Sequence, residues 1–244
     1  MTGLGVWIRG RADSVRERIA RALAYAQDSK QPFDLAMALL FEGYLYRFQR
    51  EPRQAEAACT QLLYLSEEHG FAYACDLARG VIGWARAQLG RTSEGISLIR
   101  QALAGFAERG ARVGNTDVLT RLAEAQALDG ATREALDTIE LALKTNPEEL
   151  VFRPDAIRYR GALLLKVGQN EAAEADFRDA ISMGQRMSAK AWELRAAVCL
   201  ARLWRDQGRR QNAYDLLASI YDRFIEGFDT LDLKDSKALL DQLA

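Results

Sequence analysis

The sequence predicts an all-α protein, a right-handed α-solenoid of antiparallel helix pairs that ends in a capping helix. Three observations support this prediction: a turn marker recurs about every 40 residues, small residues stand at fixed distances from it, and helical periodicity fills the intervals. Of the 244 residues, 49% are hydrophobic and 27% are charged, which is typical of a folded domain. With four prolines and no linker-like stretch, we expect one continuous domain over 1–244.

The turn marker is a residue that follows one apolar helical pattern and precedes the next. The markers are Gly10, Arg50, Gly90, Gly130, Gly168 and Gly208. Their successive intervals are 40, 40, 40, 38 and 40 residues. Because glycine enters the left-handed conformation without a steric cost, it is favoured just past the end of a helix. Each marker therefore predicts a turn between two helices.

Small or apolar residues stand at four offsets from each marker. Seven residues before it are Gly3, Gly43, Gly83, Ala123, Gly161 and Ala201. Five after it are Val15, Ala55, Gly95, Ala135, Ala173 and Ala213. Nine after it are Ile19, Cys59, Ile99, Ile139, Phe177 and Leu217, and twelve after it are Ala22, Leu62, Ala102, Ala142, Ala180 and Ile220. The last three offsets share one helix face, so small residues on both helices let an antiparallel pair pack closely.

The periodicity places eleven helices between these turns. They are expected near 13–28, 33–48, 51–68, 71–88, 92–109, 115–128, 131–144, 153–167, 170–185, 188–206 and 210–225. Pro32, Pro52 and Pro154 stand at predicted helix starts, where a missing N–H costs nothing. The prolines therefore agree with this arrangement.

The spacing of these positions is similar to the tetratricopeptide pattern. In that pattern a small residue stands seven residues before the turn glycine, and alanines stand five and twelve residues after it. The usual tetratricopeptide period is 34 residues, whereas here it is about 40, so the helices are longer. HEAT and armadillo repeats also run near 40 residues and are the main alternative. The small-residue offsets argue against them.

The C-terminal part carries a second resemblance. It resembles the repeat region of bacterial proteins that join a nucleotide cyclase module and an AAA-type ATPase to helical repeats. The segments that carry this resemblance are Gly227-Phe228-Asp229-Thr230, Glu193–Ala197 and Leu200–Trp204. The resemblance covers Trp7 to Leu243 and implies a sensing role for attached output modules. No GxxxxGK[ST] motif and nothing like a cyclase core occurs, so we do not expect that family's enzymatic activity here.

The two ends depart from the repeat. We expect residues 229–243 to form a capping helix, because Leu233, Leu240 and Leu243 share one face. Residues 1–28 form an incomplete first hairpin, since Gly3 to Ile8 covers only two helical turns. We therefore expect exposed apolar surface there and self-association through it, as in a detached sensor domain or a fragment of a larger protein.

A ligand-binding face follows from the tetratricopeptide resemblance. Such arrays resemble one another in binding on the concave face, which the first helix of each pair lines. The corresponding positions here are Tyr44, Arg47, Trp84, Asp117, Glu124, Arg158, Arg195, Arg202 and Arg205. This mixed set suits a charged peptide with Tyr44 and Trp84 as apolar anchors. The alternative is that the charges pair between repeats on a solvated face, and Trp192 and Trp204 are assigned to the core.

No catalytic set of residues stands out. His69 is the single histidine, and its place beside Gly70 is explained by a helix end. Adjacent carboxylates such as Glu148 and Glu149 point about 100° apart on a helix, so we expect them at the surface and not sharing a proton.

Cofactors, metals, nucleic acids and membranes are not expected as partners. Cys59, Cys75 and Cys199 lack the spacing of a zinc site or a disulfide framework and are expected to be buried thiols. The net charge of −1 argues against a nucleic-acid surface. No apolar run approaches the roughly 20 residues that cross a membrane, so we expect a cytoplasmic protein.

The sequence therefore predicts a non-enzymatic module that binds a peptide or protein segment in a concave groove. Such a module would act as a scaffold or sensor in bacterial signalling. The alternative function is a small-molecule-sensing regulatory domain.

Overall fold

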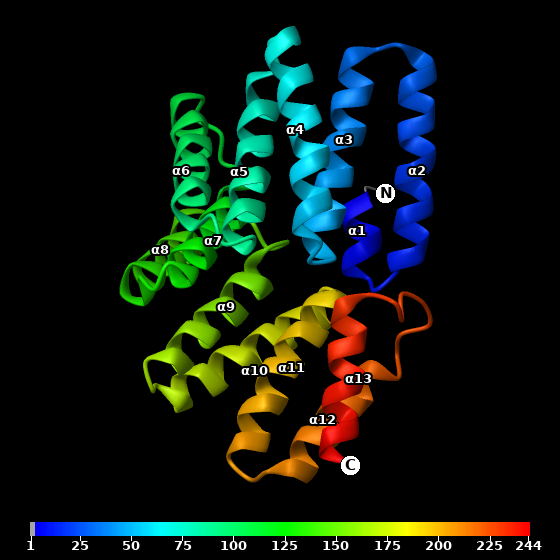
Figure 1. Cartoon of the computed structure of the whole chain (residues 1–244). Helices are drawn as coiled ribbons and strands as arrows, with labels where there is room; N and C mark the ends of the chain where they lie inside the picture. The colour runs from blue at the N-terminus through cyan, green and yellow to red at the C-terminus, as the bar shows by residue number, and fades with distance from the viewer. Residues whose placement is uncertain (1–2) are drawn as a thin grey trace. The chain divides into compact units, whose positions relative to one another are not determined.

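The computed structural model describes residues 3–244, which form thirteen α-helices and no strand (Figure 1). The helices are α1 (Gly3–Ile8), α2 (Ala12–Ser29), α3 (Pro32–Phe48), α4 (Pro52–His69), α5 (Ala72–Gln88), α6 (Thr92–Glu108), α7 (Asn115–Leu128), α8 (Thr132–Thr145), α9 (Arg153–Lys166), α10 (Asn170–Arg186), α11 (Lys190–Asp206), α12 (Arg210–Tyr221) and α13 (Leu231–Leu243). The prediction of stacked helical hairpins is confirmed.

The helix ends agree with the predicted ones to within two residues, with one exception. The helix predicted to reach residue 225 ends at Tyr221. Phe224 lies beyond this end, and its ring packs so closely on Gly10 that a Cβ there would come within 2.6 Å of it. The chain therefore leaves the helix early to make a contact far away in sequence, which periodicity does not reveal.

The turn markers adopt the left-handed conformation that the sequence predicts. The φ angles of Gly90, Gly130 and Gly208 are 85°, 87° and 80°, and Arg50 takes φ 63° at the equivalent place. After the first of these, Arg91 donates its backbone N–H to the carbonyl of Arg86 at 2.9 Å, which closes the end of α5.

Paired helices approach most closely at the small residues. A Cβ added to Gly83 of α5 would lie 2.6 Å from the carbonyl oxygen of Gly95 on α6. One added to Gly43 of α3 would lie 2.2 Å from the sulfur of Cys59 on α4. These positions are seven residues before a marker and five or nine after it. The predicted crossing is thereby confirmed for the α3/α4 and α5/α6 hairpins.

Contacts between Cα atoms divide the chain into two compact units. The central unit is Val15–Glu149, and the terminal unit combines the residues up to Ser14 with Leu150–Ala244. A single solenoid domain over 1–244 therefore stays a prediction.

The core of the central unit lies between successive hairpins. Side chains of α3 to α7 fill it, and among them Leu62, Val81, Ile99 and Val118 are each 0% exposed. Because each hairpin buries its apolar face against the next, the stability of the unit comes from stacking.

The terminal unit contains α9 to α13 together with α1. In α13, Leu233, Leu240 and Leu243 are buried, whereas Lys234 and Lys237 are exposed. One face of this helix therefore packs on the unit and the opposite face is polar.

Helix α1 differs from the expectation of an exposed apolar surface. Val6 and Trp7 are each 5% exposed and Ile8 is 8% exposed. The ring of Trp7 lies 5.0 Å from that of Trp192 on α11, within the same unit. The chain thus covers these side chains itself, and the stated reason for self-association no longer holds.

Within residues 3–244, no helix combines the length and apolar character needed to cross a bilayer.

The close approach at Gly83 predicts that replacing this glycine by alanine destabilises the protein. Glycine to alanine inside a helix normally stabilises by roughly 0.5–1 kcal/mol. We expect Gly83→Ala instead to lower the free energy of unfolding by about 1–3 kcal/mol, because the new methyl group meets the backbone of α6. Urea unfolding followed by circular dichroism measures the change.

The matched control is Ala123→Gly, at the same repeat position in α7. It should cost about 1–2 kcal/mol, because it lowers helix propensity and removes a methyl group that is 0% exposed. A stabilising effect of Gly83→Ala would show that the backbones of α5 and α6 are not in contact there.

Candidate functional site

Five of the nine expected binding residues lie on the first helices of three hairpins in the central unit. Tyr44 and Arg47 come from α3, Trp84 from α5, and Asp117 and Glu124 from α7. The structure brings these five side chains into one cluster, which we call the central cluster together with Arg121.

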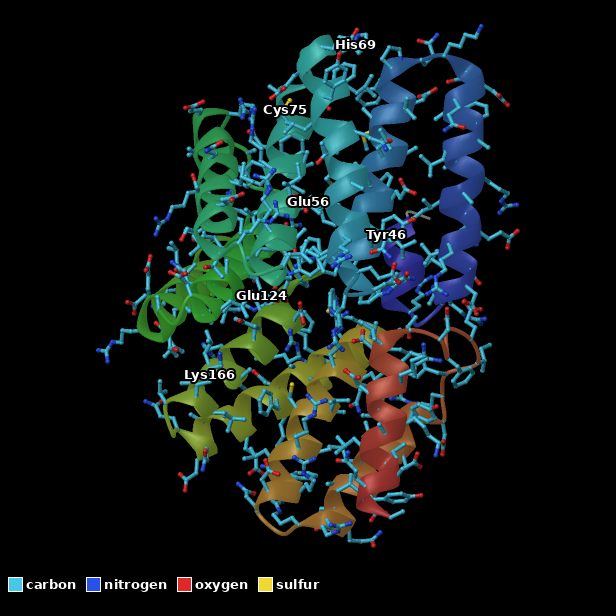
Figure 2. The ribbon with its side chains drawn as sticks, in the orientation of Figure 1. Tyr46, Glu56, His69, Cys75, Glu124 and Lys166 are labelled. Atoms are coloured by element: carbon cyan, nitrogen blue, oxygen red, sulfur yellow. The ribbon has the colours of Figure 1, made fainter. Side chains whose placement is uncertain are left out.

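Trp84 and Glu124 are joined directly. The indole N–H of Trp84 donates to Oε2 of Glu124 at 2.7 Å, although 40 residues separate them. Both stand six residues before their turn marker, so the bond links equivalent positions of neighbouring repeats. Figure 2 labels Glu124 on α7.

Asp117 lies between two arginines in the same cluster. Its Oδ1 is 2.8 Å from Nη2 of Arg47, and its Oδ2 accepts a hydrogen bond from Nη2 of Arg121 one turn along α7. The side chains of Arg47, Asp117 and Arg121 are 4%, 2% and 0% exposed. Asp117 therefore connects α3 to α7, which belong to hairpins two repeats apart.

Arg121 also lies over an aromatic ring. Its Cζ is 4.9 Å from the centroid of Tyr44, and the Cζ of Arg47 is 5.9 Å from the ring of Trp84. Room for the Arg121 guanidinium is left by Gly80, where a Cβ would come 3.1 Å from Nη1. The tetratricopeptide positions do not include Arg121, but its spacing of four from Asp117 on one helix is a signal that could have found it.

The ionisation states follow from these contacts. Burial raises the pKa of Tyr44 more than Arg121 lowers it, so the phenol stays neutral. Burial acts to lower the pKa of Arg121, but Asp117 and Tyr44 oppose it and hold this pKa above its ordinary value. The guanidinium is therefore charged at every physiological pH, and Asp117 is the anion that balances it.

Charge pairing between repeats, the alternative interpretation of these residues, describes the central unit well. Besides the Arg47 and Asp117 pair, Glu56 of α4 accepts hydrogen bonds from Arg86 at 3.0 Å and Arg91 at 2.6 Å (Figure 2). Burial acts to raise the pKa of Glu56, but the two arginines lower it further than burial raises it. The central cluster differs from that interpretation in one respect, because its charges Arg47, Asp117 and Arg121 are buried and not solvated.

The four arginines of the terminal unit do not gather into one site. Arg158 donates from Nε to Asp155 at 2.7 Å, and Arg205 donates from Nη1 to Gln242 at 3.0 Å. Arg202 is exposed. Arg195 donates from Nε to Asp232 of α13 at 2.7 Å and lies over the rings of Trp7 and Trp192.

Several expectations about single residues are confirmed. Trp192 and Trp204 are 1% and 8% exposed, so both are core residues. His69 is the last residue of α4, before Gly70 in the left-handed conformation. Cys59 is buried, and burial raises the pKa of its thiol to about 12, so the thiol is protonated. The expectation of a buried thiol is wrong for Cys199, which is only partly buried.

The expectation that Glu149 is only a surface residue is wrong. Its carboxylate accepts hydrogen bonds from the backbone N–H groups of Gly114 and Thr116 at the start of α7. These N–H groups have no partner within the helix, so a residue 33 positions away caps it. Sequence distance concealed this role.

The buried position of Asp117 predicts a large loss on substitution. Asp117→Ala leaves two buried guanidinium groups without their shared anion, so we expect the free energy of unfolding to fall by about 3–5 kcal/mol. Glu140→Ala is the control, since Glu140 pairs with Lys144 on the surface of α8 and should cost about 0–1 kcal/mol. Equal losses in urea denaturation would contradict the role of Asp117.

Comparisons with known proteins address the fold. No family model matches the sequence, and no curated protein matches it either. Among solved structures, NprR in complex with its cognate peptide NprX is similar, with TM-score 0.70 and 17% identity over 95% of this chain and 66% of that chain. This chain thus spans about two thirds of the NprR chain.

Two further structures support the same fold. A Rap protein complexed with Competence and Sporulation Factor gives TM-score 0.69 and 12% identity over 99% of this chain and 71% of that one. The TPR-like repeats of a putative kinesin light chain of Podosopora anserina give TM-score 0.54 and 16% identity over 75% and 92%. The chain therefore has the fold of the tetratricopeptide-like helical repeat proteins.

Proposed function

We propose that the chain is a regulatory domain that binds a peptide or a protein segment on the first helices of its central unit. Two of the similar structures hold a peptide or a named factor on the same fold, which supports this class of function. The likeness extends to the fold alone, so the residues have to carry the rest of the argument.

The observation that carries the proposal is the row of side chains six residues before successive turn markers. Tyr44, Trp84 and Glu124 occupy this row, and Tyr44 and Glu124 are both partly exposed. Aromatic rings next to a carboxylate suit a ligand that buries an apolar group and presents a hydrogen-bond donor or a cation. Repetition of one position along stacked hairpins gives such a ligand several contacts in series.

The buried arginines have a supporting role in this proposal. Arg47 and Arg121 are held by Asp117 and are almost fully covered, so they hold α3 and α7 together. The ligand then contacts Tyr44 and Glu124, the partly exposed members of the row. Trp84 is 5% exposed and orients Glu124 through its indole N–H.

Part of the proposal concerns the biological setting. The resemblance to repeat regions of bacterial cyclase and ATPase proteins favours a sensor in a cytoplasmic signalling assembly. Genes for a separate cyclase or ATPase next to this one, or a longer chain that contains them, would support that setting.

Peptide display tests the binding function. A library of random peptides is selected on the immobilised full chain, and the enriched peptides are titrated by calorimetry. We expect Glu124→Gln to weaken their binding about tenfold, because it removes the charge that the Trp84 indole orients.

The chain offers a matched control in its terminal unit. Glu174 accepts a hydrogen bond from the indole of Trp204 at 2.9 Å, so Glu174→Gln makes the same change in a similar pair. It should leave the peptide affinity unchanged. A selection that enriches no peptide, or an equal loss in both variants, would overturn the proposal.

A further inference from the structure

A second part of the molecule holds a short peptide segment. Helix α1 and the first turn of α2, residues 3–14, belong to the terminal unit with α11, α13 and the connecting segment 222–230. We call residues 3–14 the clasp segment. The contacts that hold it are of the kind by which proteins bind peptides.

The first contact is an aromatic cage around Trp7. Its ring meets that of Trp192 edge to face, with centroids 5.0 Å apart and an angle of 69°. The Cζ of Arg195 lies 5.0 Å from the Trp7 ring and 5.4 Å from the Trp192 ring. Asp232 fixes this guanidinium at 2.7 Å, so side chains of α11 and α13 together recognise one indole.

The second contact is a set of hydrogen bonds to the polar C-terminal end of the clasp segment. Glu226 accepts hydrogen bonds from the backbone N–H and the hydroxyl of Ser14, each at 3.0 Å. The backbone N–H of Gly227 donates to Asp13 at 3.0 Å. Burial acts to raise the pKa of Glu226, but the bonds from Ser14 and the charge of Arg11 lower it further, so the carboxylate is ionised.

The clasp segment contributes buried apolar side chains to this site, namely Val6, Trp7 and Ile8. Proteins open locally at single elements before they unfold as a whole. Such an opening of the clasp segment exposes these side chains and leaves their site to another peptide.

We propose that the face formed by α11, α13 and segment 222–230 is a second peptide-binding site, which the clasp segment fills at rest. Its ligand class is a short segment that carries tryptophan between aliphatic residues and a hydroxyl or carboxylate side chain about six residues later. This site is separate from the row on α3, α5 and α7 and does not depend on ligand binding there.

A competing peptide displaces the clasp segment from the site. This release frees the start of α2, which begins at Ala12, from its hydrogen bonds to Glu226. Because the clasp segment is tethered, its effective concentration is about millimolar or higher, and a competing peptide must overcome it.

A labelled peptide with the sequence of residues 3–14 tests the site. Its binding to full-length chains is measured by fluorescence anisotropy. We expect Trp7→Ala, which empties the cage, to bind the peptide at least about tenfold more tightly than the unchanged chain does. The same peptide with its tryptophan replaced by alanine should not bind.

A second substitution locates the bound peptide. Arg195→Met in the Trp7→Ala chain should weaken binding about tenfold, since it removes the cation that covers the indole. Arg178→Met is the control, because Arg178 lies over the ring of Trp204 at 5.6 Å and away from the clasp segment. Equal affinity of the Trp7→Ala and unchanged chains, or a peptide whose tryptophan is dispensable, would refute the proposal.

Amide hydrogen exchange on the unchanged chain tests the proposal independently of whether Trp7→Ala folds. The hydrogen-bonded amides of Gly10 and Arg11, which close the end of α1, should exchange faster than those of α11, because α1 opens locally. Exchange of α1 only through global unfolding would sink the proposal. Failure of either test leaves peptide binding by the central unit unaffected, since that function is read from Glu124 and the display selection.

Discussion

The contact on which the rest of the structure depends is the backbone approach inside each hairpin. Gly83 against Gly95 and Gly43 against Cys59 leave no space for another methyl group. At the end of each first helix, a left-handed residue such as Gly90 reverses the chain. Close pairs of helices present flat apolar faces to the next pair, so hairpins stack and their first helices stand side by side. The central cluster exists because this stacking brings α3, α5 and α7 together.

Electrostatics in the central cluster explains why a mixed set of charges need not be a binding surface. Asp117 is shared by Arg47 and Arg121, and burial makes each of the three depend on the others. These charges are paired with one another across α3 and α7 and are almost fully covered. The side chains left partly exposed, Tyr44 and Glu124, are those that a peptide would meet.

The two proposed sites use the same chemistry in different ways. At the central row, an indole is held by the carboxylate of Glu124. At the clasp segment, an indole is held by a second indole and by the cation of Arg195. A repeat protein has many equivalent helix faces, so one of them can hold a segment of the chain itself while another stays available to a partner.

Local patterns in the sequence were enough to determine the helices, the turns and the small-residue crossings, because each depends on residues within about 40 positions. Glycine conformation and helical period act locally and can be read from Gly90 or Gly83 alone. Only the tertiary structure decided which charges pair, that Glu149 caps α7, and that Trp7 is buried against Trp192. These contacts join residues 33 to 185 positions apart, and their energies depend on burial, which no local pattern contains.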